Sequence, residues 1–453
     1  MTRRARLRKI ALRALLAILA SAGCAPEPAN LLLISLDTTR ADRLSLYGHA
    51  KRTTPHLEEL AGEGVKFAQA YSATATTGPS HATLFTSLHP YTHGLLKNGI
   101  VLGSRFETLA ERLAAQGYST HGVLGSYALS AKLGFDQGFA SWDEDFEVET
   151  SSYEQRAWGG NKLTGGFDRP ADDTTRRALA WLRTLDEADR PFFLFVHYFD
   201  PHDPYAPPER FRPEGEMTSL PAQVRALYDG EIEFMDEQIG VLLHGLRTSD
   251  LADETLVVVM GDHGEGLLER DAHATHGLHI YEEGVRVPLL MRLPGAIPAG
   301  TEIRAPFGAV DLLPTVLDLL AIDASDAQFQ GTSIAESIRA GREPDASRPV
   351  YLTRRRYDPD RKRPRPDAVG EQHAIRLGRW KYFETPEEGP PELYDLEADP
   401  RERRNVAKQN AETTRELSRL LRAWRDEQRH DDSEPSEIPD DVRQKLEVMG
   451  YVE

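Results

Sequence analysis

Apolar runs that alternate with amphipathic segments dominate the chain. Residues 30–36, 191–199 and 255–261 are nearly continuous apolar runs of strand length, which is typical of strands buried on both faces of a parallel sheet. Further strands are expected over 65–73, 119–125 and 287–294, and helices over 53–64, 79–88, 107–118, 173–185, 222–247 and 311–321. Strands that alternate with helices predict an α/β fold with a mostly parallel central sheet covered by helices on both faces.

The pattern changes near residue 340. Residues 353–368 are basic and rich in proline, which indicates a solvated loop, and short strands and a polar helix over 411–428 follow. We therefore expect a large domain over 30–340 and a smaller C-terminal α+β subdomain over 341–453.

The N-terminus is typical of a targeting segment. Residues 1–23 contain six basic side chains, no acid, and an apolar run that is too short for a membrane span and is interrupted by Arg13. Cys24 is the only cysteine, so no intramolecular disulfide forms. We interpret 1–23 as a lipoprotein-type signal peptide and 24–29 as a tether. This predicts export to a bacterial periplasm or cell envelope, with a lipid anchor at Cys24. The alternative is a chance cysteine near a cleaved signal peptide.

The net charge limits the possible partners. The chain carries −18 at pH 7, so it does not attract polyanions non-specifically, which argues against nucleic acid. An anionic substrate would need a local cationic group or a metal.

Four polar features follow predicted strands. Asp37 ends the first strand, Thr77 follows the strand over 65–73, His202 follows the strand over 191–199, and Asp262-His263 ends the strand over 255–261. Ligands of parallel sheets bind beyond the carboxyl ends of the strands. Each feature alone is weak, since Asp37 is also a possible helix cap, but together they predict a divalent cation site. Carboxylate, imidazole and hydroxyl ligands favour Zn or Mn, with Ca or Mg possible.

Motifs along nearly the whole chain resemble the sulfatase family of the alkaline phosphatase superfamily. They are NLLLISLDTTRADRLSLYG (30–48), TGPSH (77–81), HPYTHG (89–94), DPHDPY (200–205), VVVMGDHGEG (257–266), HGLHIYEEGVRVPL (276–289) and ELYDLEADPRERRNVA (392–407). The resemblance implies an alkaline-phosphatase-like fold, with a sulfatase-like catalytic domain over 30–340.

The chain departs from the family pattern at the nucleophile. Where the family has a Cys or Ser that becomes formylglycine, within Cys/Ser-x-Pro-x-Arg, this chain has Thr77 and, in place of the arginine, His81. Thr38 replaces the second acid of an Asp-Asp pair, 125–130 lacks the family's Gly-Lys-Trp-His, and the metal couple is Asp-His. These changes resemble relatives with a threonine nucleophile, such as nucleotide pyrophosphatases and phosphoethanolamine transferases. In those relatives the equivalents of Asp37, Thr77, Asp262 and His263 bind one metal.

The resemblance implies roles for further residues. Thr77 would attack sulfur or phosphorus and form a covalent ester, because a bound cation makes its hydroxyl a better nucleophile. Asn98 would hold a substrate oxygen, although it also suits a turn. His202 and His276 would contact the substrate, protonate the leaving group or hold a second metal. His81 either contacts the substrate or packs beneath the nucleophile loop.

Other interpretations of these residues remain open. Thr77 is also a plausible helix cap, and Thr76 is a rival nucleophile that lies one residue out of register with Pro79. His273 and His279 flank His276, and we expect both to be surface residues outside the site.

Three functions are compatible with the motifs. We favour a metal-dependent hydrolase of sulfate or phosphate esters, acting on a small-molecule or glycan anionic ester through a covalent Thr77 intermediate. The alternatives are a phosphoethanolamine-type transferase acting on an envelope glycan or lipid, and an inactive relative that binds anionic glycans. We expect substrate selection to depend on a polar, Gly-rich excursion over 147–175 and on the basic loop over 354–365.

Overall fold

The structure is a computed structural model that describes residues 29–146, 157–158, 161–162, 167–215, 217–270, 276–356, 370–385, 389–428 and 442–443. The predicted signal peptide, Cys24, most of the tether and His273 lie outside the described residues, as do parts of the 147–175 excursion and of the 354–365 loop. None of the helices in the described ranges combines the length and apolar character that crossing a bilayer needs.

The central sheet has eight strands, and its middle is parallel, as predicted. β1 (Asn30–Leu36) lies between β9 (Thr255–Gly261) and β8 (Phe192–Tyr198), parallel to both, with Leu36 paired to Gly261 and to Tyr198. β4 (Ser119–Val123) and β5 (Ser141–Asp143) continue the sheet beyond β8. On the other side β11 (Leu289–Arg292) runs antiparallel to β9, and β2 (Val65–Phe67) and β12 (Thr301–Ile303) complete the sheet.

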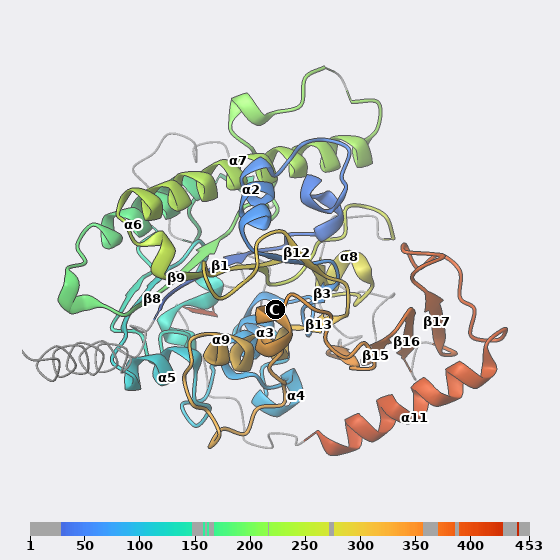
Figure 1. Cartoon of the computed structure of the whole chain (residues 1–453). Helices are drawn as coiled ribbons and strands as arrows, with labels where there is room; N and C mark the ends of the chain where they lie inside the picture. Colours follow the sequence, from blue (N-terminus) through green and yellow to red (C-terminus); the bar gives the residue numbers. More distant parts are fainter. Residues whose placement is uncertain are drawn as a thin grey trace, which may run out of the picture.

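Helices cover both faces of this sheet (Figure 1). One layer contains α2 (Pro55–Glu63), α6 (Ala171–Leu182) and α7 (Leu220–Thr248), and the other contains α3 (Thr77–Thr86), α5 (Leu109–Ala115), α9 (Leu312–Leu319) and α10 (Ala335–Arg339). Along β1, Leu31 and Leu33 enter the core beneath the second layer, whereas Leu32 and Ile34 enter the core beneath the first. Successive side chains of a strand point to opposite faces, which is why this strand is apolar at nearly every position.

Two predicted elements needed correction. The expected single strand over 65–73 is two strands, β2 in the central sheet and β3 (Ala70–Tyr71) in a second sheet between β10 (Arg286–Val287) and β13 (Phe307–Gly308). An apolar run does not reveal that the chain changes partner within it. The helix expected over 79–88 begins at Thr77. Pro79 is tolerated inside the first turn because the N–H groups of that turn have no partner within the helix.

Shorter elements connect these layers. They are α4 (Pro90–His93), α8 (Glu282–Val285), the strand pair β6 (Ala157–Trp158) and β7 (Asn161–Lys162), and 3-10 turns at Ala41–Arg43, Ser45–Tyr47, Tyr127–Leu129, Ala131–Leu133, Glu187–Asp189, Glu209–Phe211, Ala252–Glu254 and Ala309–Asp311.

The predicted C-terminal subdomain is an antiparallel sheet with one helix. β14 (Val350–Arg354), β15 (Gln372–Leu377), β16 (Trp380–Glu384) and β17 (Glu392–Asp395) pair in sequence order. The amphipathic helix α11 (Ala411–Glu427) packs Leu417, Leu421 and Trp424 against this sheet. The predicted domain boundary at residue 340 falls in the connection between α10 and β14.

A buried ion-pair group joins this subdomain to the large domain. Lys381 on β16 places its Nζ 3.0 Å from Glu282 Oε1 of α8 and 3.1 Å from Glu402 Oε1. The second carboxylate oxygen of Glu402 accepts a hydrogen bond from the Glu282 backbone N–H at 2.6 Å. Lys381 and Glu402 are buried. One lysine therefore serves two acids from different domains.

Candidate active site

Two aspartates meet at the carboxyl edge of the central sheet. The Asp37 N–H donates to Tyr198 O of β8 at 3.0 Å, and the Asp262 N–H donates to Leu36 O of β1 at 3.1 Å. Both residues directly follow neighbouring parallel strands, so the predicted convergence of strand ends is what the fold produces.

The nucleophile candidate lies at the start of α3. Thr77 is the first helical residue, it is fully buried, and its Oγ1 lies 3.1 Å from His263 Nε2. The helix is held in place by Ser80, whose hydroxyl donates to Asp262 O at 2.6 Å. Thr76 occupies the N-cap position, but its side chain forms no capping hydrogen bond. The Thr77 hydroxyl therefore contacts the histidine of the cluster.

The oxygen atoms of the two aspartates have too few partners for buried carboxylates. Asp262 Oδ1 accepts hydrogen bonds from the N–H groups of Thr38 and His263, at 3.1 and 2.6 Å. Within the described chain, Asp262 Oδ2 and both carboxylate oxygens of Asp37 have no hydrogen-bond partner. Buried charged groups are normally paired or coordinate a metal.

The histidine offers a third ligand atom. His263 Nδ1 lies 2.9 Å from Gly264 O; since a carbonyl only accepts, Nδ1 carries the proton and the lone pair of Nε2 is available. His263 Nε2 lies 3.7 Å from Asp37 Oδ1 and 3.6 Å from Asp262 Oδ2. One atom from each of these three residues lies within 4.8 Å of the others. Two carboxylates, a neutral imidazole and the Thr77 hydroxyl therefore fit a divalent cation.

Burial shifts all three groups towards their neutral forms. Burial raises the pKa of Asp37, and burial together with the neighbouring Asp37 raises the pKa of Asp262. Burial lowers the pKa of His263. A cation in this position would favour the ionised carboxylates and the neutral imidazole, the forms in which these groups are ligands.

His81, predicted as a possible substrate contact, bonds only protein groups here. Its Nδ1 lies 2.8 Å from Thr77 O and its Nε2 lies 2.8 Å from the Ser35 hydroxyl. Burial and the neighbouring His197 lower the pKa of His81 to about 3, so the ring is neutral. It donates from Nδ1 to Thr77 O and accepts from Ser35. This geometry favours a positioning role beneath the nucleophile, and substrate contact stays a prediction.

His197 is a site residue that sequence reasoning missed. It lies on β8, its Nε2 is 3.3 Å from Asp37 Oδ2, and its ring centroid is 5.1 Å from that of His81. Neither ring nitrogen has a hydrogen-bond partner among the described residues. His81, His197 and Asp262 form a second group whose ligand atoms lie within 4.8 Å of one another. The signal was available: a histidine in an otherwise apolar, fully buried strand.

His202 and His276 lie on the other side of His263. The ring of His276 is 4.8 Å from that of His263 and 5.0 Å from that of His202, centroid to centroid. Glu265, which sequence reasoning also missed, places Oε2 3.4 Å from His276 Nδ1. Burial alone would lower the pKa of His276, but the carboxylates of Glu265 and Asp37 outweigh it and raise that pKa. His276 is thus suited to carry a proton.

Asn98 and His279 complete the predicted set. Asn98 Oδ1 accepts a hydrogen bond from the Gly78 N–H at 2.7 Å, so the structure brings Asn98 to the first turn of α3, and its amide nitrogen remains as a donor. His279 is half-buried and packs near the ring of Tyr281, at 5.6 Å between centroids, outside the histidine and aspartate cluster.

The segment after His263 is tightly constrained by α8. The Gly264 N–H donates to Gly284 O at 2.8 Å. A Cβ at Gly264 would lie 2.0 Å from Glu283 O, so only glycine fits between His263 and Glu265.

A parallel-sheet edge that presents an aspartate pair, a histidine and a hydroxyl at a helix start is compatible with an ester-bond hydrolase, and the sheet with helices on both faces is an alkaline-phosphatase-like fold. The sulfatase family model matches residues 29–322, and the chain belongs to the sulfatase family, whose members hydrolyse sulfate esters with the help of a metal. A second model, N-sulphoglucosamine sulphohydrolase, C-terminal, matches residues 276–427.

Individual relatives span nearly the whole chain. The N-acetylgalactosamine-6-O-sulfatase of Bacteroides thetaiotaomicron is 26% identical, over 86% of this chain and 92% of that protein. The structure of BT4656 in complex with its substrate D-glucosamine-2-N,6-O-disulfate is similar with a TM-score of 0.74 at 22% identity, over 91% of this chain and 100% of that chain. The phosphonate monoester hydrolase of Agrobacterium radiobacter gives a TM-score of 0.72 at 24% identity, over 88% and 96% of the two chains. The fold is therefore common to sulfate-ester and phosphonate-ester hydrolases.

Proposed function

We propose that the protein hydrolyses sulfate or phosphate esters through a covalent Thr77 intermediate, with Asp37, Thr77, Asp262 and His263 holding one divalent cation. The observation that carries this proposal is the position of Thr77 Oγ1, 3.1 Å from His263 Nε2, together with three carboxylate oxygens of Asp37 and Asp262 that lack hydrogen-bond partners among the described residues. An alcohol that only capped a helix would bond backbone N–H groups instead.

Each of the site residues has a separate role in the proposed reaction. Thr77 Oγ1 gives its proton to water and attacks the sulfur or phosphorus atom in line with the departing alcohol, so that one oxygen–sulfur or oxygen–phosphorus bond forms while the other breaks. A bound divalent cation would lower the pKa of the hydroxyl and stabilise the charge on the transferred group. His276 supplies a proton to the departing alcohol, with His202 next to it. The Asn98 amide and the start of α3 bind the non-bridging oxygens. Water then attacks the Thr77 ester, releases the inorganic anion and restores the hydroxyl.

The chemistry of the ligands supports Zn or Mn as the cation, with Ca or Mg as further candidates. A second cation would find oxygen and nitrogen atoms at Glu265, His202 and His276. Sulfated glycans are the proposed substrate class, because the N-acetylgalactosamine-6-O-sulfatase relative and the glucosamine-disulfate complex both act on such sugars. Phosphate or phosphonate esters are the alternative, supported by the monoester hydrolase of similar fold.

Thr77→Ala tests the chemistry. It is compared with wild type on an aryl sulfate, a phosphate monoester and a phosphodiester, with and without chelator. Thr76→Ala is the matched control, since it removes the same hydroxyl one residue earlier. We expect Thr77→Ala and chelation each to abolish turnover, Thr76→Ala to retain it, and acid-quenched wild type to carry a sulfo or phospho group on Thr77 by mass spectrometry. Equal rates for Thr77→Ala and wild type on every substrate would remove Thr77 from the mechanism.

We also propose an envelope location, with the chain anchored by a lipid on Cys24. Expression of wild type and Cys24→Ser in a bacterial host, followed by fractionation, tests this. We expect only wild type to pellet with membranes and to incorporate labelled fatty acid. Equal distribution of the two proteins would contradict the anchor.

A further inference from the structure

A cavity of about 450 Å³ is lined in part by Glu269, which follows Glu265 by four residues in the sequence. Four acids, Asp42, Glu269, Glu282 and Glu283, reach its wall. Six arginines line it: Arg40, Arg43, Arg225, Arg286, Arg401 and Arg403. The wall therefore has two more cationic than anionic groups, in a chain whose net charge is −18.

The acids at this wall are already paired. Arg40 binds both Asp42 and Glu269 at 2.8 Å. Glu282 pairs with Lys381 at 3.0 Å, and Glu283 pairs with Arg270. These four carboxylates are therefore satisfied without the rest of the arginines.

The remaining five arginines differ in whether they form an ion pair. Arg43 pairs with Asp229. In the part of the chain that the structure describes, Arg225, Arg286, Arg401 and Arg403 form no ion pair with a carboxylate.

Backbone carbonyls hold three of these four guanidinium groups, and of the three Arg286 also acts electrostatically on the carboxylates of Asp42 and Glu282. Arg286 Nη2 donates to Ala68 O at 2.9 Å, Arg225 Nη1 to Leu267 O at 3.4 Å, and Arg403 Nη1 to Glu269 O at 3.4 Å. Arg286 Nε is buried and, among the described atoms, has no acceptor. A buried donor on a charged group without an acceptor is costly, and an anion in the cavity would supply both the acceptor and the charge.

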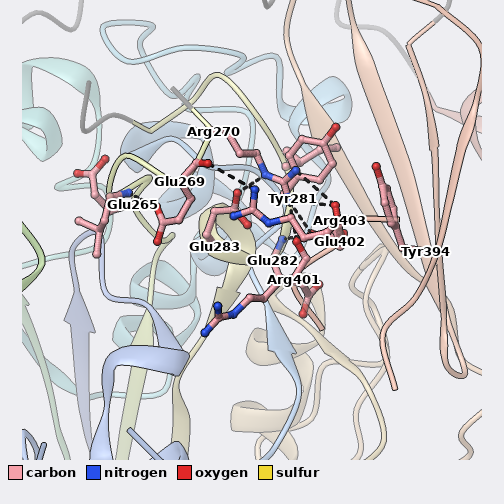
Figure 2. Close-up of polar contacts among 12 residues, drawn as sticks. Glu265, Glu269, Arg270, Tyr281, Glu282, Glu283, Tyr394, Arg401, Glu402 and Arg403 are labelled. Atoms are coloured by element: carbon pink, nitrogen blue, oxygen red, sulfur yellow. Dashed lines mark hydrogen bonds and ion pairs between the residues drawn. The ribbon is translucent and has the colours of Figure 1, made fainter. Parts of the chain in front are cut away.

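The loop that carries Arg401 and Arg403 is held in place by contacts with Arg270 and Lys381 (Figure 2). Glu402 between them is buried and adopts a left-handed backbone conformation, with φ of 52°, that a non-glycine residue seldom takes. Its carboxylate pairs with Lys381, and Arg270 Nη2 donates to Arg401 O at 3.0 Å while its guanidinium stacks 3.6 Å from the centroid of the Tyr281 ring. The side chains on either side of Glu402 are exposed, so this support holds two arginines at the rim.

We propose that this cavity binds an oxyanion (a sulfate, phosphate or carboxylate group) between Arg286, Arg401 and Arg403. Guanidinium groups bind such groups through two parallel N–H donors. The anion has two possible sources, a second anionic group of the substrate or a free inorganic anion. The first rests on the proposed function. Contacts through Glu265 connect the two sites: Arg40, which lines the cavity, donates through Nη1 to Glu265 O at 2.9 Å, while the Glu265 carboxylate lies 3.4 Å from His276 Nδ1.

Direct binding tests the proposal independently of catalysis. Inorganic sulfate and phosphate are titrated calorimetrically into the full chain in chelator, which removes the cation needed for anion binding at the catalytic cluster. Arg401→Ala/Arg403→Ala is compared with Arg404→Ala/Lys408→Ala, which removes the same charge from exposed neighbours that do not line the cavity. Thermal unfolding checks that both variants fold.

We expect wild type and the control to bind one anion, and the cavity variant to bind it about tenfold or more weakly. No binding by wild type, or equal binding by the cavity variant and the control, would overturn the proposal. Since turnover is not measured, neither outcome bears on Thr77.

The source of the anion is separated with metal-loaded Thr77→Ala protein. If the substrate supplies it, glucosamine-2-N,6-O-disulfate binds more tightly than glucosamine-6-O-sulfate, and the cavity variant loses this preference. If a free anion supplies it, the two sugars bind equally while inorganic sulfate still binds the cavity. Both results support an oxyanion site, and they differ in its occupant.

Discussion

Two pairs of acids, Glu282 with Glu402 and Asp37 with Asp262, differ in how their negative charge is balanced. Glu282 and Glu402 share Lys381, whose Nζ lies 3.0 and 3.1 Å from their oxygens. Among the described residues, the only basic side chains that pair with Asp37 and Asp262 are histidines, at 3.3 to 3.7 Å, and burial lowers the pKa values of His263 and His197. The cation of the first pair is a side chain of the protein, Lys381, and we call this the closed pair. Among the described residues, no lysine or arginine pairs with Asp37 or Asp262, and we call these two aspartates the open pair.

The difference indicates which pair serves the fold and which serves chemistry. A pair closed by lysine is complete when the chain has folded. A pair left open destabilises the folded protein until something positive binds, and such sites are where catalytic groups are found. The comparison leads to four predictions.

The largest expected effect is that of Asp262→Asn on activity. Asparagine keeps the oxygen that accepts from Thr38 and His263 but removes one charge from the open pair. We expect kcat/KM on the preferred ester to fall by about a thousandfold or more, with loss of bound metal by elemental analysis. In chelator, the same variant is expected to unfold at higher urea than wild type, because repulsion with Asp37 is gone. A fully metallated variant with wild-type rates would contradict the open-pair interpretation.

Lys381→Met breaks the closed pair. Removing the nearest cation of the buried Glu402 and of Glu282 is expected to lower the free energy of unfolding by about 3–5 kcal/mol, measured by urea denaturation. Lys408→Met is the control, since this lysine is exposed. The second change in Lys381→Met/Glu402→Gln should restore part of the loss. A loss within the range of surface ion pairs, below about 1 kcal/mol, would show that Lys381 is not what closes this pair.

Chelation is expected to affect the stability contributed by the open pair but not that contributed by the closed pair. Removing a cation that is present at one hundred to one thousand times its dissociation constant should lower the stability of wild type by about 3–4 kcal/mol. Lys381→Met should lose the same amount, because its defect lies elsewhere, whereas Asp262→Asn should lose little. The measurement is the urea midpoint with and without chelator, and equal loss in all three proteins would mean that the cation binds outside the open pair.

Ser35→Ala is expected to have the smallest effect. It removes the hydroxyl that bonds His81 Nε2 at 2.8 Å and leaves that nitrogen buried without a partner, at about 1–3 kcal/mol of stability. Because His81 in turn bonds Thr77 O, kcat should fall by less than about tenfold with KM unchanged. A change in KM alone would instead indicate that His81 contacts the substrate.

The sequence predicted the fold class and the open pair for one shared reason. In a parallel sheet, strand order alone brings the residues after β1 and β9 to one edge, so Asp37, Asp262 and His263 could be placed together without coordinates. Thr77 was located by the motif around Pro79, although the helix begins earlier than expected.

Residues that depend on pairing across the structure were not predicted. His197 lies inside an apolar strand, and Ser35 acts through a histidine 46 residues away. The closed pair joins α8 to a loop 120 residues later, and the strand over 65–73 changes sheets without a change in hydrophobicity. Local pattern can mark an unusual residue, such as a histidine in an apolar strand, but it does not identify the distant residue with which it pairs.

The close packing of α8 against Gly264 has a consequence for how this protein is engineered. α8 lies against the backbone between His263 and Glu265, and the same short helix accepts its support from Glu402 and Lys381. A protein truncated at residue 340 would therefore lose Lys381 and Glu402, which support α8, the helix that packs against the backbone next to His263. The large domain and the C-terminal subdomain must therefore be expressed and engineered together.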